Sequence, residues 1–447
     1  MSALGARFDA AVSRRYPDAF ELAGLAALGA AAVALAAGAV AKPTLALIAV
    51  PAFAVVLLLL LRTDFALLLV VATAPIEGLF ASGPAGISVT KLAGGICIAS
   101  FVFNVFRERR VLVFERGQAL VLGILALALL STLQAHDSGS ALTTATRYAS
   151  FAAVYVIFTQ YGHDGAFQRR IAWTLSITCS VIAVVGLYEY QSGKQSLATL
   201  PYANSNDFAF ILATSLPLIF VLLDSRRLRP LVAGMIGVVS AATLLSLSRG
   251  ALLGLGAGFV LFVLTDRRRV KLTLLAGLAA TIGTLVVIHI NPERFHEAIF
   301  LKQQVAQQNV TTRFQAWGAA ARLATDHPFL GVGPGNFKLY YNKLTGQPVG
   351  VLTLTVAHNA FLDVGAELGI VAMCLLALYL LLAFVRLTSS LYEGYGDPGF
   401  VRALRISLTI AIVSAMFLSE QYFLPFWLFG GLAAAIWVRG RQATDTG

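Results

Sequence analysis

The feature that most constrains this chain is a series of long apolar runs that continues along almost its whole length. Hydrophobic residues make up 58% of the 447 residues and charged residues only 12%, whereas soluble domains typically carry about 25% charged residues. A soluble fold could not cover so much apolar surface. The chain is therefore expected to be an all-α polytopic membrane protein with lipid as its solvent.

The apolar runs also give an approximate number of crossings. One bilayer crossing takes about 20 apolar residues, and about fourteen runs approach this length, or twelve if the shorter runs merge. The expected crossings are 19–41, 44–61, 65–80, 87–106, 119–133, 143–161, 171–190, 208–223, 231–247, 251–264, 272–290, 360–385, 406–418 and 424–438. No repeat or low-complexity linker divides them, so residues 1–447 are interpreted as a single integral membrane domain.

The basic residues indicate orientation rather than a nucleic-acid partner. The net charge of +11 comes from short Lys and Arg clusters between apolar runs, not from one basic surface. With alternating crossings, most of the 33 Lys and Arg residues fall on one side, which the positive-inside rule assigns to the cytoplasm. Both termini are therefore expected to be cytoplasmic, and nucleic-acid binding is excluded.

One outer connection, residues 291–357, contains no expected crossing. Loops of this length are usually functional or disordered. Aromatic side chains such as Trp317 occur in it among helix-forming residues, so amphipathic helices at the outer leaflet are expected. The loop is expected to form part of any active site on the outer side.

Two arginines on the outer side are candidate functional residues. Arg249 lies in a turn between two crossings that are too short to be complete, so this turn is expected below the membrane surface. A charge at such a depth marks a functional site unless it snorkels to lipid phosphate. Arg313 lies on a helix that is expected to end before Pro328 and shares a face with Trp317. It would bind an anionic ligand or a neighbouring carboxylate.

His358 and Asn359 lie where the long loop meets the next crossing. A histidine here is a candidate general base, and the alternative is a helix-capping or buried hydrogen-bonded histidine. Asp363 and Glu367 share a helix face that points away from His358, so they are interpreted as structural ion-pair partners. The basic residues considered for those ion pairs are Arg147 and Lys91.

Weaker signals surround these candidates. Asn204-Ser205-Asn206, after Tyr202, opens a crossing from the outer side and is interpreted first as a helix cap and second as a sugar contact. Residues 331–335, Gly-Val-Gly-Pro-Gly, are interpreted as a turn rather than an anion-binding nest. The sequence contains no DxD motif, metal-ligand cluster or GxSxG motif, which argues against a metal-dependent glycosyltransferase or a serine hydrolase.

In combination, three motifs resemble the O-antigen ligase and polymerase superfamily of Gram-negative surface-polysaccharide assembly. They are SRG at 248–250, TRFQAWGAAARLATDHPFLGVGPGNF at 312–337 and HNAFLDVGAELGI at 358–370. The resemblance covers mainly residues 200–375. His358, Asn359 and Gly369 match the ligase signature of the family, whereas Ala372 departs from its last position. Asn204-Ser205-Asn206 is similar to an Asn-Pro-Asn element of the family, with Ser in the middle.

The resemblance implies a GT-C-like, metal-independent inverting glycosyltransferase of the bacterial inner membrane. It would transfer an oligo- or polysaccharide from undecaprenyl pyrophosphate, the donor carrier, to an acceptor hydroxyl on the periplasmic face. The implied roles are diphosphate binding by Arg249 and Arg313, and deprotonation or orientation of the acceptor hydroxyl by His358 with support from Asn359. No cofactor is implied, and membrane lipids surround the protein.

Further substrate contacts are expected from Tyr202, Asn204, Asn206, Arg147 and Trp317. The acceptor distinguishes two alternatives: a ligase uses lipid A–core, whereas a polymerase uses a second lipid-linked glycan, and the ligase signature favours the ligase. A lipid-linked oligosaccharide flippase is the alternative from another class. The candidates lie on one side under one loop, which favours an enzyme over a transporter with paired halves.

Overall fold

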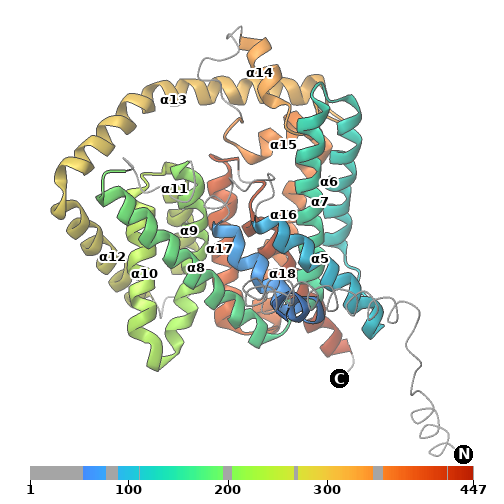
Figure 1. Cartoon of the computed structure of the whole chain (residues 1–447), viewed down its shortest axis with the longest axis horizontal. Helices are drawn as coiled ribbons and strands as arrows, with labels where there is room; N and C mark the ends of the chain where they lie inside the picture. Colours follow the sequence, from blue (N-terminus) through green and yellow to red (C-terminus); the bar gives the residue numbers. More distant parts are fainter. Residues whose placement is uncertain are drawn as a thin grey trace, which may run out of the picture. The chain divides into compact units, whose positions relative to one another are not determined.

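A computed structural model of the chain describes residues 54–76, 89–109, 111–194, 204–265, 270–345, 356–419 and 421–445. These residues form helices joined by short connections, and they contain no strand. The helices, shown in Figure 1, are α4 (Thr63–Thr73), α5 (Val89–Glu108), α6 (Arg116–Ser131), α7 (Ser138–Tyr161), α8 (Gly165–Gln191), α9 (Ser205–Val221), α10 (Arg229–Leu245), α11 (Arg249–Thr265), α12 (Val270–Ile290), α13 (Pro292–Asp326), α14 (Phe337–Thr345), α15 (Ala360–Leu368), α16 (Ile370–Glu393), α17 (Pro398–Ala415) and α18 (Leu424–Asp445).

The helices confirm a multi-pass helical membrane protein. In the described ranges, seven helices are long and apolar enough to cross a membrane, and one bent pair would make eight. Two shorter apolar helices, Arg249–Thr265 and Thr281–Ile290, accompany them. The expected crossing 19–41 lies outside the described residues, as do parts of the next three. The number of about fourteen crossings stays a prediction.

The chain divides into two compact units. Unit 1 comprises Met1–Ala66 and Gly95–Leu112, and unit 2 comprises Leu67–Gly94 and Val113–Gly447. All the candidate residues of the sequence analysis belong to unit 2.

A break in unit 1 shows how polar side chains provide hydrogen bonds for main-chain groups where a helix is interrupted. The helix that ends at Leu61 is separated by a break from the helix that begins at Thr63, and both residues belong to unit 1. The carbonyl oxygen of Leu60, next to the break, accepts hydrogen bonds from Asn104 Nδ2 at 2.9 Å and Ser100 Oγ at 3.1 Å. Because lipid offers no hydrogen-bond donor, such side chains allow irregular backbone to occur among apolar residues.

In unit 2, α18 packs against α7 and α16, and α17 packs against α9 and α11. The indole of Trp427 on α18 stacks with Phe151 of α7 at 5.8 Å and with Tyr379 of α16 at 5.5 Å between ring centroids. The Tyr379 hydroxyl donates to the carbonyl oxygen of Phe426 at 2.9 Å. Large rings with satisfied polar ends therefore join these three helices.

Small residues set the contact between α11 and α17. A Cβ added at Gly254 would collide with the side chain of Ser414 and lie 2.8 Å from the Ile410 carbonyl oxygen. A Cβ added at Gly258 would lie 2.6 Å from Cγ1 of Ile410. Such residues let helices approach closely in membranes, where lipid removes the hydrophobic drive for association.

The expected crossing 360–385 is two helices rather than one. Gly369 has a φ of 92°, which ends α15 and begins α16. The amide of Ile370 donates instead to the carbonyl oxygen of Pro328 at 2.8 Å. The first part of the expected crossing is therefore a short helix, and it packs against α13.

The helix α13 itself occupies much of the expected loop 291–357. It ends at Asp326, before Pro328 as expected, and one of its faces carries Ala316, Ala320 and Leu323 in a buried cluster with Ala366 of α15. Figure 1 shows α13 running from the end of α12 to the region of α14 and α15. Ordered helices in this loop are thus present in its described part.

A buried ion pair connects α16 with the start of α6. The Arg386 guanidinium pairs with the carboxylate of Glu115, and their side chains are only 7% and 4% exposed. Glu115 also caps α6 by accepting from the amides of Gly117 and Gln118, and it accepts from the Tyr155 hydroxyl at 2.6 Å. One carboxylate therefore holds α6, α7 and α16 together.

Removing only one partner of this pair should be costly. Arg386→Met leaves the Glu115 carboxylate buried without a cation, and the expected loss of stability is about 3–5 kcal/mol. The unfolding midpoint of the purified protein in detergent should fall, and the double variant with Glu115→Gln should recover part of the loss. A double variant as unstable as Arg386→Met would contradict a role for charge pairing.

Candidate functional site

The α17–α18 connection, described at residues 416–419 and 421–423, contacts Arg313, Trp317 and the start of α11. Arg313 of α13 donates from Nη1 to the carbonyl oxygen of Phe417 at 3.3 Å. The ring of Trp317, one turn further along α13, lies 6.3 Å from that of Phe417. A Cβ added at Gly250 would lie 3.2 Å from Cγ of Leu418, so the start of α11 contacts the same connection. Helices α11 and α13 therefore meet at one irregular segment.

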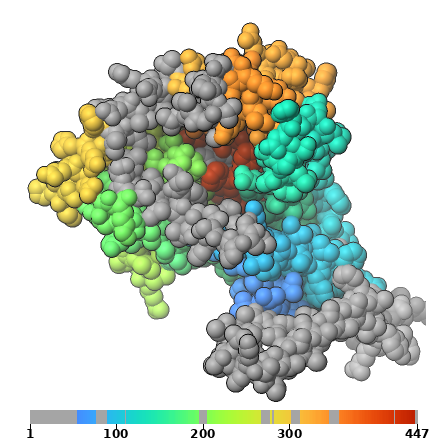
Figure 2. Space-filling view, turned by 45° about the horizontal axis from the view of Figure 1, so that its top comes forward, coloured from blue at the N-terminus to red at the C-terminus, as the bar shows by residue number. Residues whose placement is uncertain are grey.

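This end of unit 2 is hollowed. Figure 2 shows a hollow with the orange of α14 and α15 and the teal of α6 and α7 at its rim. The red of the C-terminal helices and the green of the region around α10 and α11 are visible inside it.

Arg249 and Arg313 form a pair of like charges. Arg249 is the first residue of α11 and is exposed, whereas Arg313 is half-buried. Burial lowers the pKa of Arg313, and the neighbouring charge of Arg249 adds to this effect. Neither arginine forms an ion pair with a described residue. Two adjacent guanidiniums without a carboxylate favour a bound anion.

His358 lies in a strained turn beside this pair. Its φ is 56°, a left-handed conformation that is uncommon for residues other than glycine. Asn359 caps α15 by accepting from the amides of Phe361 and Leu362, both at 3.1 Å. Burial, with a smaller effect of the Arg313 charge, lowers the pKa of His358 to about 4. The imidazole is therefore neutral at pH 7 and can accept a proton.

Asp363 and Glu367 differ from the expectation of ion pairs. Asp363 Oδ1 accepts from the amide of Ala357 at 2.6 Å, and its Oδ2 accepts from the Ser419 hydroxyl. Glu367 Oε2 accepts from the Tyr422 hydroxyl at 2.9 Å. No described Arg or Lys pairs with either carboxylate. The ion-pair interpretation is wrong because hydroxyls and amides occupy the positions that a cation would take.

These two carboxyl groups are fully enclosed. Burial raises the pKa of Asp363 to about 6 and, together with the negative charge of Asp363, raises the pKa of Glu367 to about 7. Both residues are therefore largely protonated in mildly acidic conditions. Their role in the structure is to hold backbone and hydroxyl groups rather than to neutralise an arginine.

The glycine-rich segment is a structural turn, as expected. Gly331, Gly333 and Gly335 all have positive φ angles. The amide of Val332 donates to the carbonyl oxygen of Ala366 at 2.9 Å. The amide of Gly333 donates to the main-chain carbonyl oxygen of Glu367 at 3.0 Å. Because these amides bond to α15, they are not available to an anion. The segment anchors α15 to the end of α13.

The other candidate residues differ in whether their contacts reach the α17–α18 connection. The Arg147 guanidinium lies over the ring of Tyr422 at 5.8 Å, so α7 reaches the α17–α18 connection. Asn204 caps α9 by accepting from the amide of Asn206 at 2.9 Å, as the first interpretation of that motif predicts. Nothing in the described contacts of Asn204 and Asn206 joins them to Arg313 or His358. Tyr202 lies outside the described residues.

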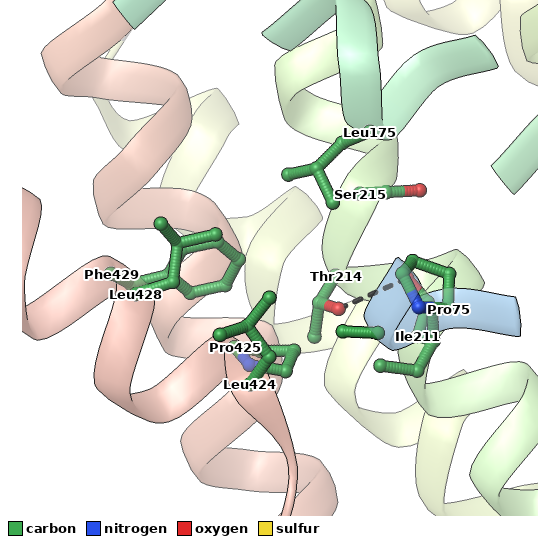
Figure 3. A pocket seen from close by; sticks show the side chains of 10 residues that line it. Pro75, Leu175, Ile211, Thr214, Ser215, Leu424, Pro425, Leu428 and Phe429 are labelled. Atoms are coloured by element: carbon green, nitrogen blue, oxygen red, sulfur yellow. Dashed lines mark hydrogen bonds between the residues drawn. The ribbon is translucent and has the colours of Figure 1, made fainter. Parts of the chain in front are cut away.

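A separate apolar pocket lies between α8, α9 and α18 (Figure 3). The hydroxyls of Thr214 and Ser215 in its lining donate to carbonyl oxygens of their own helix at 2.8 Å. The rest of the lining is Ala74, Pro75, Leu175, Ile211, Leu424, Pro425, Leu428 and Phe429. Without a charged or titratable side chain, this pocket is not a centre for chemistry.

Sequence reasoning missed the α17–α18 connection as part of the site. Residues 419–422, Ser-Glu-Gln-Tyr, are a polar run between two apolar segments. That run is a usable signal, because polar residues at a membrane connection need partners. Ser419 and Tyr422 find them in Asp363 and Glu367.

The burial of Glu367 has a measurable consequence for stability. Because its pKa is raised from 4.5 to about 7, its contribution is fully present below pH 4.5 and is lost as the pH rises through 7. Glu367→Gln mimics the neutral form, so its unfolding midpoint should exceed that of the wild type above pH 7. The two midpoints should converge towards pH 4.5. Asp326→Asn, an exposed acid on α13, is the control, and parallel pH curves for Glu367→Gln and wild type would contradict the expectation.

Comparison with known proteins identifies the segment that carries these residues. No curated protein matches the chain. A family model described as O-antigen ligase matches residues 233–377. The match includes Arg249, Arg313 and His358, together with the glycine-rich segment and α15. Residues 233–377, about a third of the chain, are thus similar to the O-antigen ligase family, and this match supports the O-antigen ligase superfamily.

Proposed function

We propose that this protein transfers a glycan from undecaprenyl pyrophosphate to an acceptor hydroxyl on the periplasmic face of the bacterial inner membrane, as an O-antigen ligase of GT-C type. The observation that carries this proposal is that Arg313, which bonds to Phe417 of the α17–α18 connection, has both Arg249 and His358 as neighbours. Two cations and a neutral base next to one another suit a diphosphate leaving group and an attacking hydroxyl.

The two arginines would bind the diphosphate of the donor. Burial lowers the pKa of Arg313 and the Arg249 charge lowers it further, and a diphosphate between the two guanidiniums would offset this like-charge repulsion. As the bond between the anomeric carbon and the diphosphate oxygen breaks, negative charge grows on that oxygen. Guanidiniums already in place stabilise this charge without reorganisation and without a metal ion.

His358 would accept the proton of the acceptor hydroxyl. The hydroxyl oxygen attacks the anomeric carbon from the side opposite the diphosphate, which inverts its configuration, and the proton passes to the imidazole. In the free protein, burial and Arg313 hold the pKa of His358 at about 4. A bound diphosphate offsets the Arg313 charge, so the imidazole becomes a stronger base when the donor is present.

Trp317 is proposed as a contact for the sugar next to the diphosphate. Its indole lies one helical turn from Arg313 and 5.5 Å from the ring of the exposed Phe314. The indole Nε1 is enclosed and has no acceptor among the residues described. An aromatic face beside Arg313 suits the apolar face of a sugar ring. Asn359, Arg147, Asn204, Asn206 and Tyr202 are proposed as further substrate contacts.

The test is transfer by the purified protein in nanodiscs, with a chelator present, from a lipid-linked glycan to core lipopolysaccharide. His358→Ala should lower kcat by about 10²–10⁴-fold, and Arg313→Met should weaken use of the donor. Arg322→Met is the matched control, because Arg322 is an exposed arginine on the same helix. Full activity of His358→Ala and Arg313→Met would refute the assignment.

A second acceptor separates the alternatives within the superfamily. Product on core lipopolysaccharide supports a ligase, whereas laddered product on a second lipid-linked glycan would identify an O-antigen or exopolysaccharide polymerase. Dependence on an added metal ion would overturn the metal-independent mechanism. Movement of the lipid-linked glycan across vesicles without transfer to either acceptor would favour a flippase.

A further inference from the structure

The carboxyl group of Asp363 bridges two segments that are distant in sequence. Its Oδ1 accepts from the amide of Ala357, and its Oδ2 accepts from the hydroxyl of Ser419. Asp363 is only 1% exposed, so solvent does not compete for either bond. A single buried side chain thus joins the turn before α15 to the α17–α18 connection.

One of these bonds acts on His358. Ala357 immediately precedes His358, whose left-handed backbone persists only if neighbouring groups hold it. On the other side of His358, the carbonyl oxygen of Asn359 accepts from the amide of Asp363 at 2.9 Å. Asp363 therefore holds the turn on both sides of the histidine, through its side chain and its main chain.

The other bond acts on the partner of Arg313. Ser419 lies two residues after Phe417, whose carbonyl oxygen accepts from the Arg313 guanidinium at 3.3 Å. The ring of Phe417 also contacts Trp317. The bond from Ser419 to Asp363 therefore limits how far this carbonyl and ring can move from the histidine turn.

We infer that Asp363 is a positioning residue that sets the geometry between His358 and the Arg313 side of the site. It holds backbone and a hydroxyl through hydrogen bonds, and no contact places it against the reacting atoms. This inference rests on the proposed function, in which His358 receives a proton while Arg313 holds the diphosphate. A displacement of about 1 Å between such groups costs up to about 100-fold in rate.

Three substitutions separate the two bonds. Asp363→Ala removes both, so kcat should fall by about 10-fold to 100-fold and the KM for the donor should rise. Ser419→Ala removes only the bond towards the Arg313 side, so KM should rise with kcat little changed. Asp363→Asn keeps an acceptor for Ala357 and a polar partner for Ser419, so it should restore most of kcat.

Glu367→Gln is the matched control, because Glu367 is a buried carboxyl on the same helix that contacts Tyr422 and the amide of Phe337 instead. Its kcat should match the wild type. An equal loss of kcat in Glu367→Gln and Asp363→Ala would show a general effect of disturbing α15 and would overturn the inference. If Asp363→Ala does not accumulate in membranes, Asp363→Glu, which lengthens the acceptor by one methylene, is expected to lower kcat in the same way.

A second readout does not depend on transfer. Diethylpyrocarbonate modification of His358, followed by peptide mass spectrometry, reports how well the histidine turn is held. Modification should be slow in the wild type and Asp363→Asn and faster in Asp363→Ala. Unchanged modification and unchanged kcat in Asp363→Ala would overturn the inference. If the wild type transfers nothing, the proposed function fails, and the modification rates alone decide whether Asp363 positions His358.

Discussion

In an apolar surrounding, every interruption of a helix leaves main-chain groups that only the protein itself can satisfy. Much of the architecture around the site follows from that constraint. The amide of Ile370, after the break at Gly369, bonds to Pro328, and the amides of Val332 and Gly333 bond to the end of α15. At several places where a helix is interrupted, the main-chain donors of one interruption bond to the main-chain acceptors of another. Irregular backbone is therefore concentrated at one end of unit 2. The polar side chains that such backbone requires become available for chemistry at the same place.

The described arginines of unit 2 are of two kinds, those paired with a carboxylate and those without one. Arg386 is buried with Glu115, and the pair also holds a helix cap and a tyrosine hydroxyl. Arg249 and Arg313 lie close to each other, and no carboxylate of the described chain pairs with them. Arg386 has its anion within the protein, whereas in the proposed function Arg249 and Arg313 would pair with the diphosphate of the donor.

The sequence was sufficient for features that depend on local pattern. Hydropathy predicts the all-helical membrane fold, Pro328 predicts the end of α13, and Asn204 is predicted as a cap from its position before an apolar run. The resemblance of the three motifs predicts the family. Each of these follows from residues that are close in sequence.

Features that depend on distant partners were not predictable in this way. The partners of Asp363 and Glu367 are Ser419 and Tyr422, which lie 56 and 55 residues further along, and no spacing rule connects them. The division of 360–385 into two helices depends on the positive φ of Gly369. Hydropathy averaged over a window does not detect a single residue of this kind, because the apolar character continues on both sides of it.

The close contact of α11 with α17 has a consequence for how the site can adapt. At Gly254 and Gly258 the two helices are closely packed, because glycine brings no side chain and α17 contributes the Ile410 carbonyl oxygen and the branched side chains of Ile410 and Ile406, which are stiff at χ1. Arg249 at the start of α11 and Phe417 just after the end of α17 are therefore carried by one rigid pair of helices. Arg313 reaches the same place from α13 on a long flexible side chain. Under the proposed function, adjustment to glycans of different size would fall to the α13 side, while the α11 side would act as a fixed reference.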